Sequence, residues 1–433
     1  MNNMMLRVTA AMVVVLVCGV SAIAQRQIDP ATGLSLEQLT ALAFERSPEI
    51  HAVHARIAAA RGQLRQAALR PNPMVTAGRR EEPGGSDNQM SLMLEVPLDL
   101  FRRAGRVGMA AATLTAVELE VANHERMFAA DVRERAGAVL VAARMLSVAD
   151  DLLLVTRGMH ELLTARVAEG AAPPLDRDVA ETEVRRLEAE RAARAAQADA
   201  ALIALKAMVG LSPDATLTLR DDLEQQIRAD AASASPAEPG DDTIQQRADV
   251  REAAARVNVA DARIRQLERE ARFDLGVYGG YMRMDQGFPQ RGVSDAGALE
   301  RVRGVFHYVE GGGKLTLPLF NRNQGAIAAA EAEKQGAERT REARELQARA
   351  EVVAARVFEV ETRRSLELFA RARDLARRNV DVVRESYQLG RNTLFEVFAE
   401  QRRLVDVETA YVEALAVAFD AHTAWLRATG AKP

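Results

Sequence analysis

The sequence FDLGVYGGY at residues 273–281 has an alternating pattern from which the fold prediction starts. Phe273, Leu275 and Val277 alternate with polar or small residues such as Asp274. This alternation is typical of a β-strand, because successive side chains point to opposite faces of a sheet. One face is apolar enough for lipid and the other is small or polar, as the wall of a membrane barrel requires.

The neighbouring segments place this strand in a larger unit. We expect the strand to cover residues 273–284 and a second strand to cover residues 305–319, after a polar stretch rich in glycine. A helix is predicted before the hairpin at 243–272. A very long helix follows at 323–389, and a shorter one returns at 394–429.

The same order of elements occurs earlier in the chain, at an offset of about 200 to 220 residues, which indicates a repeated structural unit. Gly170 matches Gly390, and Gly210 matches Gly430. The elements predicted for the first copy are a helix at 36–70, strands at 74–80 and 90–98, and helices at 104–168 and 175–209.

The repeats divide the chain into domains. The boundary between the copies is rich in Ser, Pro, Ala and Asp, which is typical of a linker. The predicted divisions are a signal peptide at 1–24, an N-terminal lead at 25–35, repeat 1 at 36–211, a linker at 212–242, repeat 2 at 243–430 and a tail at 431–433.

The predicted helices differ in length in a way that suggests how they pack. The two uninterrupted helices, at 104–168 and 323–389, would each run about 100 Å, while each returning helix would run roughly 53 Å. An opening helix stacked end to end on a returning helix makes up the difference. We therefore expect a cylinder in which each long helix lies beside a two-piece helix, packed by coiled-coil-like apolar seams.

The N-terminus has the features of an export signal. Arg7 precedes an apolar run that ends in Ala22-Ile23-Ala24, a small-x-small cleavage site. Cys18 is the only cysteine and lies inside this segment, so the mature chain would have neither an intrachain disulfide nor a thiolate metal site. The alternative to removal is lipidation of Cys18.

Composition excludes several classes of protein. The net charge is −4 and no block of basic residues marks a nucleic-acid partner. The mature chain also lacks an uncharged apolar run of the roughly 20 residues that span a bilayer as a helix. Four strands cannot close a barrel, so the chain would share one with copies of itself. Two, three or four chains would give eight, twelve or sixteen strands.

Four short motifs resemble those of the TolC family of outer membrane efflux proteins, and the last two are similar to its CzcC-like heavy-metal branch. They are SLEQL at 35–39, RSPEI at 46–50, RPNP at 70–73 and PLFNRNQG at 318–325. RRAGR at 102–106 departs from the Gly-Gly-Lys-like turn of many relatives.

The resemblance implies a mixed α/β, mostly α-helical fold. Four membrane strands per chain would form a twelve-stranded barrel in a homotrimer, continued by a helical periplasmic tunnel. The implied partners are a periplasmic membrane-fusion adaptor and an inner-membrane pump of the resistance-nodulation-division type. The implied function is passive conduction of heavy-metal cations through the outer membrane, with no enzyme activity and no cofactor.

The two turns between long and returning helices are the candidate functional sites. One interpretation is purely structural: these residues reverse the chain direction through glycine caps and a capping box of Thr393 and Glu396. The functional interpretation adds a periplasmic mouth and an adaptor surface. The mouth candidates are Asp176, Asp178, Glu396 and Glu400, and the adaptor-contact candidates are Gly170, Pro173, Tyr387, Gly390, Arg391 and Thr393.

Other candidate sites are weaker. His51 and His54 have a helical spacing that can present two imidazoles to a metal, but a solvated pair is the default. The strand methionines favour lipid contact over soft-metal binding; they are Met90, Met93, Met282 and Met284. No catalytic motif is present. The alternatives to metal efflux are an exit duct for drugs or for type I secretion, and a soluble periplasmic coiled-coil scaffold.

Overall fold

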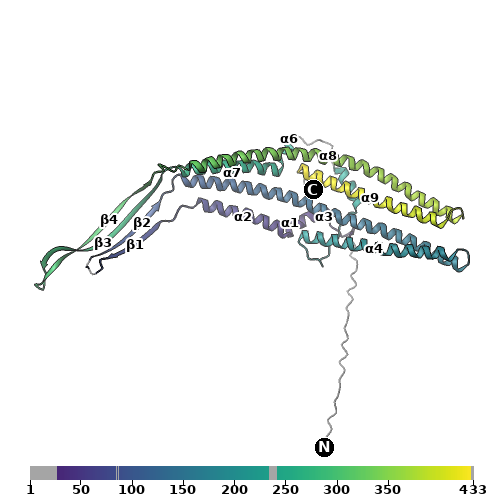
Figure 1. The fold of residues 1–433 in the computed structure, drawn as a ribbon, viewed down its shortest axis with the longest axis horizontal. Helices are drawn as coiled ribbons and strands as arrows, with labels where there is room; N and C mark the ends of the chain where they lie inside the picture. The colour runs from purple at the N-terminus through teal and green to yellow at the C-terminus, as the bar shows by residue number, and fades with distance from the viewer. Residues whose placement is uncertain (1–26, 84, 86, 234–240, 431–433) are drawn as a thin grey trace, which may run out of the picture.

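The computed structural model describes residues 27–83, 85, 87–233 and 241–430. The predicted signal peptide, with Cys18, lies outside the described residues, as do part of the linker and the C-terminal tail. The molecule is long and narrow, with a β-sheet at one end and helices that extend to the opposite end (Figure 1). The predicted fold class, mostly helical with four antiparallel strands, is confirmed.

The sheet unites the two predicted hairpins in the order β1-β2-β3-β4. Its strands are β1 (Met74–Glu81), β2 (Asn88–Pro97), β3 (Asp274–Val293) and β4 (Leu299–Thr316). The hairpins join because β2 pairs with β3, with Leu92 opposite Tyr281. Within the described residues, the outer edges of β1 and β4 have no strand partner.

The two faces of the sheet differ, as the alternation at 273–281 predicts. Residues that are opposite each other on paired strands share a face. One side, here called the apolar face, is exposed and carries Val75, Leu92, Leu94, Val277, Tyr281 and Val309. The other side, here called the polar face, is half-buried along β2 and β3 and carries Thr76, Arg80, Gln89, Ser91, Glu95 and Tyr278.

The second hairpin is longer than predicted. The polar stretch expected between strands at 273–284 and 305–319 is divided between the two strands, because β3 continues to Val293 and β4 begins at Leu299. The register shifts between Gly287 and Arg291, because a bulge lets the strand continue past residues that cannot join the regular ladder. Glycine and proline therefore mark an irregularity in this strand rather than its end.

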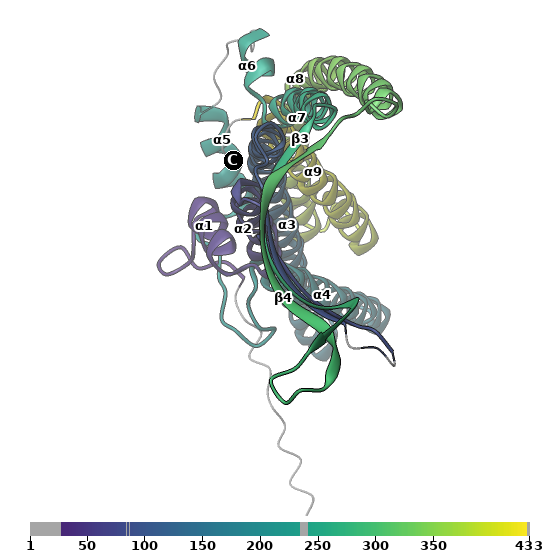
Figure 2. The same ribbon diagram turned by 90° about the vertical axis from the view of Figure 1, so that its left-hand side faces the viewer.

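The helices pack side by side into a curved layer (Figures 1 and 2). They are α2 (Pro48–Ala68), α3 (Arg102–Ala168), α4 (Pro174–Val209), α7 (Ala248–Glu270), α8 (Gln324–Gln388) and α9 (Leu394–Thr429). The long helix α3 packs against α2 and α4 and also against α7 and α9. The second long helix, α8, packs against α7 and α9.

Both opening helices are broken, which corrects the prediction of one helix at 36–70 and one at 243–272. In repeat 1, α1 (Leu36–Arg46) ends before Ser47, whose extended backbone (ψ 122°) is the conformation that a following proline favours. In repeat 2, α6 (Asp241–Gln246) ends before Arg247, which is also extended (ψ 139°).

Each break receives the end of a returning helix, so the predicted end-to-end stacking is confirmed. Gly210, which follows α4 with φ 85°, abuts the first break. A Cβ on this glycine would lie 2.5 Å from the carbonyl oxygen of Arg46. At the second break, Arg247 donates a hydrogen bond of 2.9 Å to the carbonyl oxygen of Ala428, near the end of α9.

The segment predicted as a linker contains a packed helix, α5 (Leu223–Ser233). Leu223 is buried in the main core of the molecule, together with Leu217 and Leu219 from the loop that precedes α5. The same core contains Leu140 of α3 and Phe419 of α9. The segment between the repeats is therefore part of the folded structure and not a simple tether.

Candidate functional site

The two predicted turns lie together at the end of the molecule opposite the sheet (Figure 1). Met159 and Leu163 near the end of α3 pack with Leu394 and Val397 at the start of α9, and Ala180 of α4 joins them. This apolar cluster connects the helical hairpin of repeat 1 to that of repeat 2. Both turns therefore lie in one packed tip.

The backbone of both turns has the predicted caps. Gly170 and Gly390 have φ of 73° and 71°, the left-handed conformation that glycine adopts without strain. Thr393 begins α9 with the predicted capping box, because its hydroxyl accepts the backbone N–H of Glu396 and the carboxylate accepts the N–H of Thr393 at 2.7 Å. Pro173 precedes α4 in an extended conformation.

The predicted adaptor-contact residues of repeat 2 occupy structural positions in the turn. Tyr387 is partly buried against the apolar cluster of the tip. The backbone N–H of Arg391 donates to the carbonyl oxygen of Ser386 at 3.0 Å and closes the last turn of α8. The side chain of Arg391 is exposed, so it remains accessible for a contact.

Three of the four predicted mouth carboxylates have a partner close by in sequence. Asp178 pairs with Arg177 at 2.6 Å, Glu400 pairs with Arg403 at 2.5 Å, and Glu396 serves the capping box. Asp176 is half-buried at the start of α4. These residues lie near the tip, but their role in a mouth remains a prediction.

Apolar side chains at the tip were not singled out from the sequence. Phe395 is 81% exposed, and Leu175 and Leu389 are exposed as well. Each lies at or next to a predicted turn residue. Their position beside cap residues in the sequence is the signal that could have identified them, since a turn that only reverses the chain has no need of exposed leucine or phenylalanine.

The two histidines considered for metal binding have separate partners. Nε2 of His51 lies 2.8 Å from the carbonyl oxygen of Glu45, and Nε2 of His54 lies 2.6 Å from the carboxylate of Glu125. Across the described residues, no group of three or more His, Cys, Asp or Glu side chains is arranged to hold a metal ion.

A buried ionic network holds α5 in place. Arg133 of α3 pairs with Asp230 of α5, and Nδ1 of His422 on α9 lies 2.9 Å from Glu359 of α8. Nε2 of the same histidine is 4.0 Å from Asp230. Glu359 is 1% exposed and His422 5%. No motif or spacing connects these four residues, so sequence reasoning missed the network.

A second set of contacts ties the start of α5 to the same helices. The carboxylate of Glu224 lies 3.3 Å from Arg144 of α3 and 3.2 Å from Arg373 of α8. Arg373 also stacks 4.1 Å from the ring of Tyr411 on α9. Burial raises the pKa of Tyr411, and the charge of Glu224 adds to this shift.

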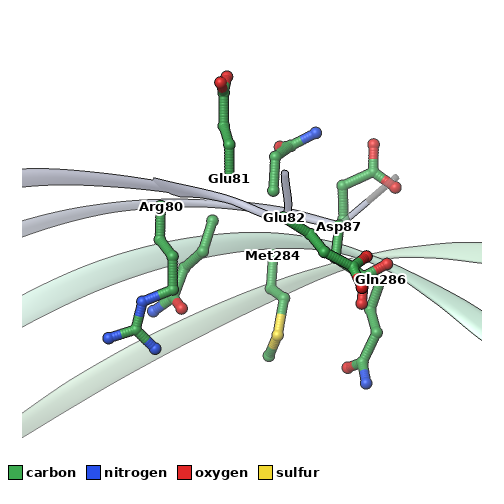
Figure 3. Close-up of a pocket in the computed structure, with 9 residues that line it drawn as sticks. Arg80, Glu81, Glu82, Asp87, Met284 and Gln286 are labelled. Carbon is green, nitrogen blue, oxygen red and sulfur yellow. The ribbon is translucent and has the colours of Figure 1, made fainter. Parts of the chain in front are cut away.

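The opposite end of the molecule contains a cavity of about 280 Å³ beside the β1–β2 turn. Figure 3 shows Arg80, Met284 and Gln286 extending to one side of the strands, with Glu81 on the other. Glu82 and Asp87 of the turn also line the cavity. The polar face of the sheet thus ends in a pocket with both basic and acidic side chains.

No helix in the described parts of the chain combines the length and the apolar character that a membrane span needs.

Comparison with known proteins identifies the fold. Residues 39–211 match the sequence pattern of the family described as outer membrane efflux protein. No curated protein matches the chain by sequence.

Solved structures match almost the whole chain. CusC, described with conformational changes accompanying folding and transmembrane channel formation, is similar with a TM-score of 0.74 and 16% identity, over 92% of each chain. VceC of Vibrio cholerae is similar with a TM-score of 0.69 and 20% sequence identity, over 91% of this chain and 96% of that chain. The MtrE channel of Neisseria gonorrhoeae, in its open state, is similar with a TM-score of 0.74 and 17% sequence identity, over 91% of this chain and 88% of that chain. Residues 39–211 therefore carry the pattern of the outer membrane efflux protein family, and the chain as a whole has the fold of these solved structures.

Proposed function

We propose that the chain is one subunit of an outer-membrane exit duct, exported by its N-terminal signal and assembled from three copies into a twelve-stranded barrel with a periplasmic helical tunnel. The observation that carries this proposal is the four-stranded sheet, whose two outer edges are unpaired within the described residues and whose apolar face is exposed. Unpaired backbone groups are not tolerated in lipid, so such a sheet needs copies of itself to close a barrel.

The chain order supports ring closure. β1 follows α2 and β4 leads toward α8, so each open sheet edge continues into an outer column of the helical layer. If the α8 side of one copy packs against the α2 and α4 side of the next, β4 of the first copy can pair with β1 of the second, so that every strand has a partner on both sides. A head-to-tail contact of this kind closes into a ring when its rotation permits.

An exposed apolar seam on α8 supports the same contact. Leu346 is 70% exposed and Val353 is 63% exposed, seven residues further along the helix. A seven-residue apolar repeat is the pattern of a coiled-coil seam. More exposed residues continue this spacing, with one interval of eight residues in place of seven: Val360, Leu368, Leu375 and Val382. We infer that the helical layer of a second copy covers this seam.

The tip supports the proposed partners. Exposed Phe395, Leu175 and Leu389 surround two capped turns at the end farthest from the sheet. An apolar surface of this kind suits a protein partner, here a periplasmic membrane-fusion adaptor that connects the duct to an inner-membrane pump of the resistance-nodulation-division type. Asp176, Asp178, Glu396 and Glu400 would then line or flank the mouth and favour cations.

The proposed cargo is heavy-metal cations. The motifs RPNP at 70–73 and PLFNRNQG at 318–325 are similar to the CzcC-like branch. A duct for drugs or for type I secretion would share the same architecture. Sensitivity of a deletion strain separates these possibilities: hypersensitivity to metal salts supports the proposal, and hypersensitivity to antimicrobial compounds alone contradicts it.

The channel itself is tested with the full chain purified in detergent. Native mass spectrometry is expected to show three copies, and planar bilayers are expected to show stepwise ion conductance. A monomer that gives no conductance would contradict the proposed function. Recovery of the native protein in the soluble periplasmic fraction would favour the scaffold alternative instead.

A further inference from the structure

Three methionines share the polar face of the sheet. Met93 of β2 is opposite Gly280, while Met282 and Met284 of β3 are opposite Ser91 and Gln89. The sheet register turns these three methionines away from the apolar face, so the prediction of lipid contact is not retained for them. Met90 lies on the apolar face with Leu92 and is exposed, so lipid contact stays a prediction for it.

Each thioether lies within reach of the next one, so an ion can be shared by Met93 and Met282 or by Met282 and Met284, whereas Met93 and Met284 are four residues apart along the strands, about 13 Å. Met282 and Met284 are next-but-one neighbours on β3, and Met93 is diagonal to Met282 across the β2–β3 pair. Diagonal neighbours on one face have Cβ atoms about 7–8 Å apart, within reach of long side chains. Methionine is unbranched with three rotatable bonds, so two sulfurs can turn toward a common point.

The sulfur atoms lie among polar groups. Nε2 of Gln89 donates a hydrogen bond to Sδ of Met282. Met284 lines the cavity at the outer end of the sheet and extends to the same side as Arg80 and Gln286 (Figure 3). Leucine would fill the same space equally well, whereas a thioether adds a lone pair that accepts hydrogen bonds and binds soft metals.

The charges beside Met93 and Met282 suit a single positive charge, while Arg80 beside Met284 shares its cavity with the carboxylates of Glu82 and Asp87. Glu95 on the same face is paired with Lys314 at 2.7 Å, which neutralises its carboxylate. Glu310 of β4 is opposite Gly280 and extends over it, toward the strand that carries Met93. One carboxylate beside several thioethers does not provide the oxygen cage that a hard divalent ion needs. Thioether ligands select soft ions such as Cu(I).

We propose that Met93, Met282 and Met284 form a row of two overlapping binding positions for a soft monovalent cation, Cu(I) or Ag(I), on the wall of the duct, with the carboxylate of Glu310 beside the position shared by Met93 and Met282. The site rests on the proposed function and narrows its substrate class from heavy-metal cations to soft ones. Neutral thioethers hold such an ion without trapping it, which conduction requires, because an ion must leave each site as readily as it enters.

The first test uses Ag⁺ in chloride-free buffer as the probe. The full chain, labelled with carbon-13 at its methionine methyl groups and purified in detergent, is titrated while methyl resonances are recorded. Shifts at Met93, Met282 and Met284, with Met90 unchanged, are the expected result. Unmoved resonances, equal shifts at all methionines, or the same response to Zn²⁺ would overturn the site.

The second test compares two leucine variants by equilibrium dialysis against Ag⁺. The triple variant Met93→Leu, Met282→Leu, Met284→Leu is expected to bind at least about tenfold more weakly than the native chain, because the soft ligands are lost. Met90→Leu is the matched control and is expected to bind normally. Leucine preserves side-chain volume closely, so both variants should fold.

The tests separate this inference from the channel proposal. Normal ion conductance in planar bilayers combined with no specific Ag⁺ binding would overturn the soft-cation site and leave the duct intact. Specific Ag⁺ binding without any conductance would overturn the duct and leave the site. If the triple variant fails to fold, the methyl shifts of the native chain still decide the matter.

Discussion

Gly137 sets how closely α9 can approach α3. A Cβ at this position would lie 2.3 Å from the ring of Phe419, which also stacks 4.8 Å from the guanidinium of Arg133. Gly137→Ala should lower the free energy of unfolding by about 1–3 kcal/mol, as overpacking of a core does, measured by urea unfolding in detergent.

Gly158→Ala on the same helix is the control, because its Cβ would meet nothing within 4 Å. Alanine favours helix over glycine by up to about 1 kcal/mol, so this variant should be neutral or more stable. Equal destabilisation by both variants would contradict close packing at Gly137.

Glu396 combines a structural and a proposed electrostatic role, and one substitution separates them. A glutamine at this position can still complete a capping box with Thr393, since the motif accepts either Glu or Gln, but it carries no charge. Glu396→Gln should therefore leave stability unchanged and reduce cation selectivity of the conductance in planar bilayers. Unchanged ion selectivity would count against a position in the mouth.

Helix α5 connects the two repeats through the buried ionic network of Arg133, Asp230, His422 and Glu359. Asp230→Asn leaves the Arg133 guanidinium buried without its counter-charge. Breaking a buried pair from one side costs about 3–5 kcal/mol, so the variant should unfold at distinctly lower urea concentration.

The control for this experiment is Arg228→Gln on the same helix. Arg228 forms an exposed pair with Glu224, and such pairs contribute at most about 1 kcal/mol. If Asp230→Asn were as mild as the control, the buried network would not hold α5.

The free energy of unfolding should depend on pH through the contact between the end of α9 and the start of α7. Burial alone would raise the pKa of Asp249, but the hydrogen bond and charge of Arg247 outweigh burial, so this pKa lies below its ordinary value. A carboxyl with a lowered folded pKa stabilises the fold above its unfolded pKa, about 3.9 for aspartate, and loses this contribution as pH falls through the folded value.

Urea unfolding of the native chain and of Asp249→Asn over a pH series measures this contribution. The native chain should be the more stable one above about pH 4, and the difference should shrink as pH falls below that value. A difference that stays constant with pH would contradict the role of the Asp249 charge.

At the scale of the whole molecule, the α8 seam should hold the oligomer. Val353→Asp places a charge in a seam that is exposed in one chain and covered in the proposed trimer. We expect native mass spectrometry to show mainly monomers, because a buried unpaired charge is costly. Val353→Leu keeps the seam apolar and should remain trimeric. A trimer that survives Val353→Asp would place the contact elsewhere.

Local chemistry predicted much of the fold. The ends of α4 and α9 follow from Gly210 and Gly430, and the Thr393 capping box formed as expected. The break at Ser47 could have been predicted from Pro48, since proline restricts the residue before it. The break at Arg247 has no such local signal, and the contact made there, from the guanidinium to the carbonyl oxygen of Ala428, joins residues far apart in the sequence.

The candidate sites divide in the same way. Alternation at residues 273–281 and glycine caps at Gly170 and Gly390 act within a few residues, so two hairpins, two long helices and two turns follow from local sequence. Which residues meet across these elements depends on tertiary packing. The face that carries Met93 and Met282 depends on the β2–β3 register, and the buried ionic network at α5 depends on packing of four distant segments, where burial makes each charge need a partner.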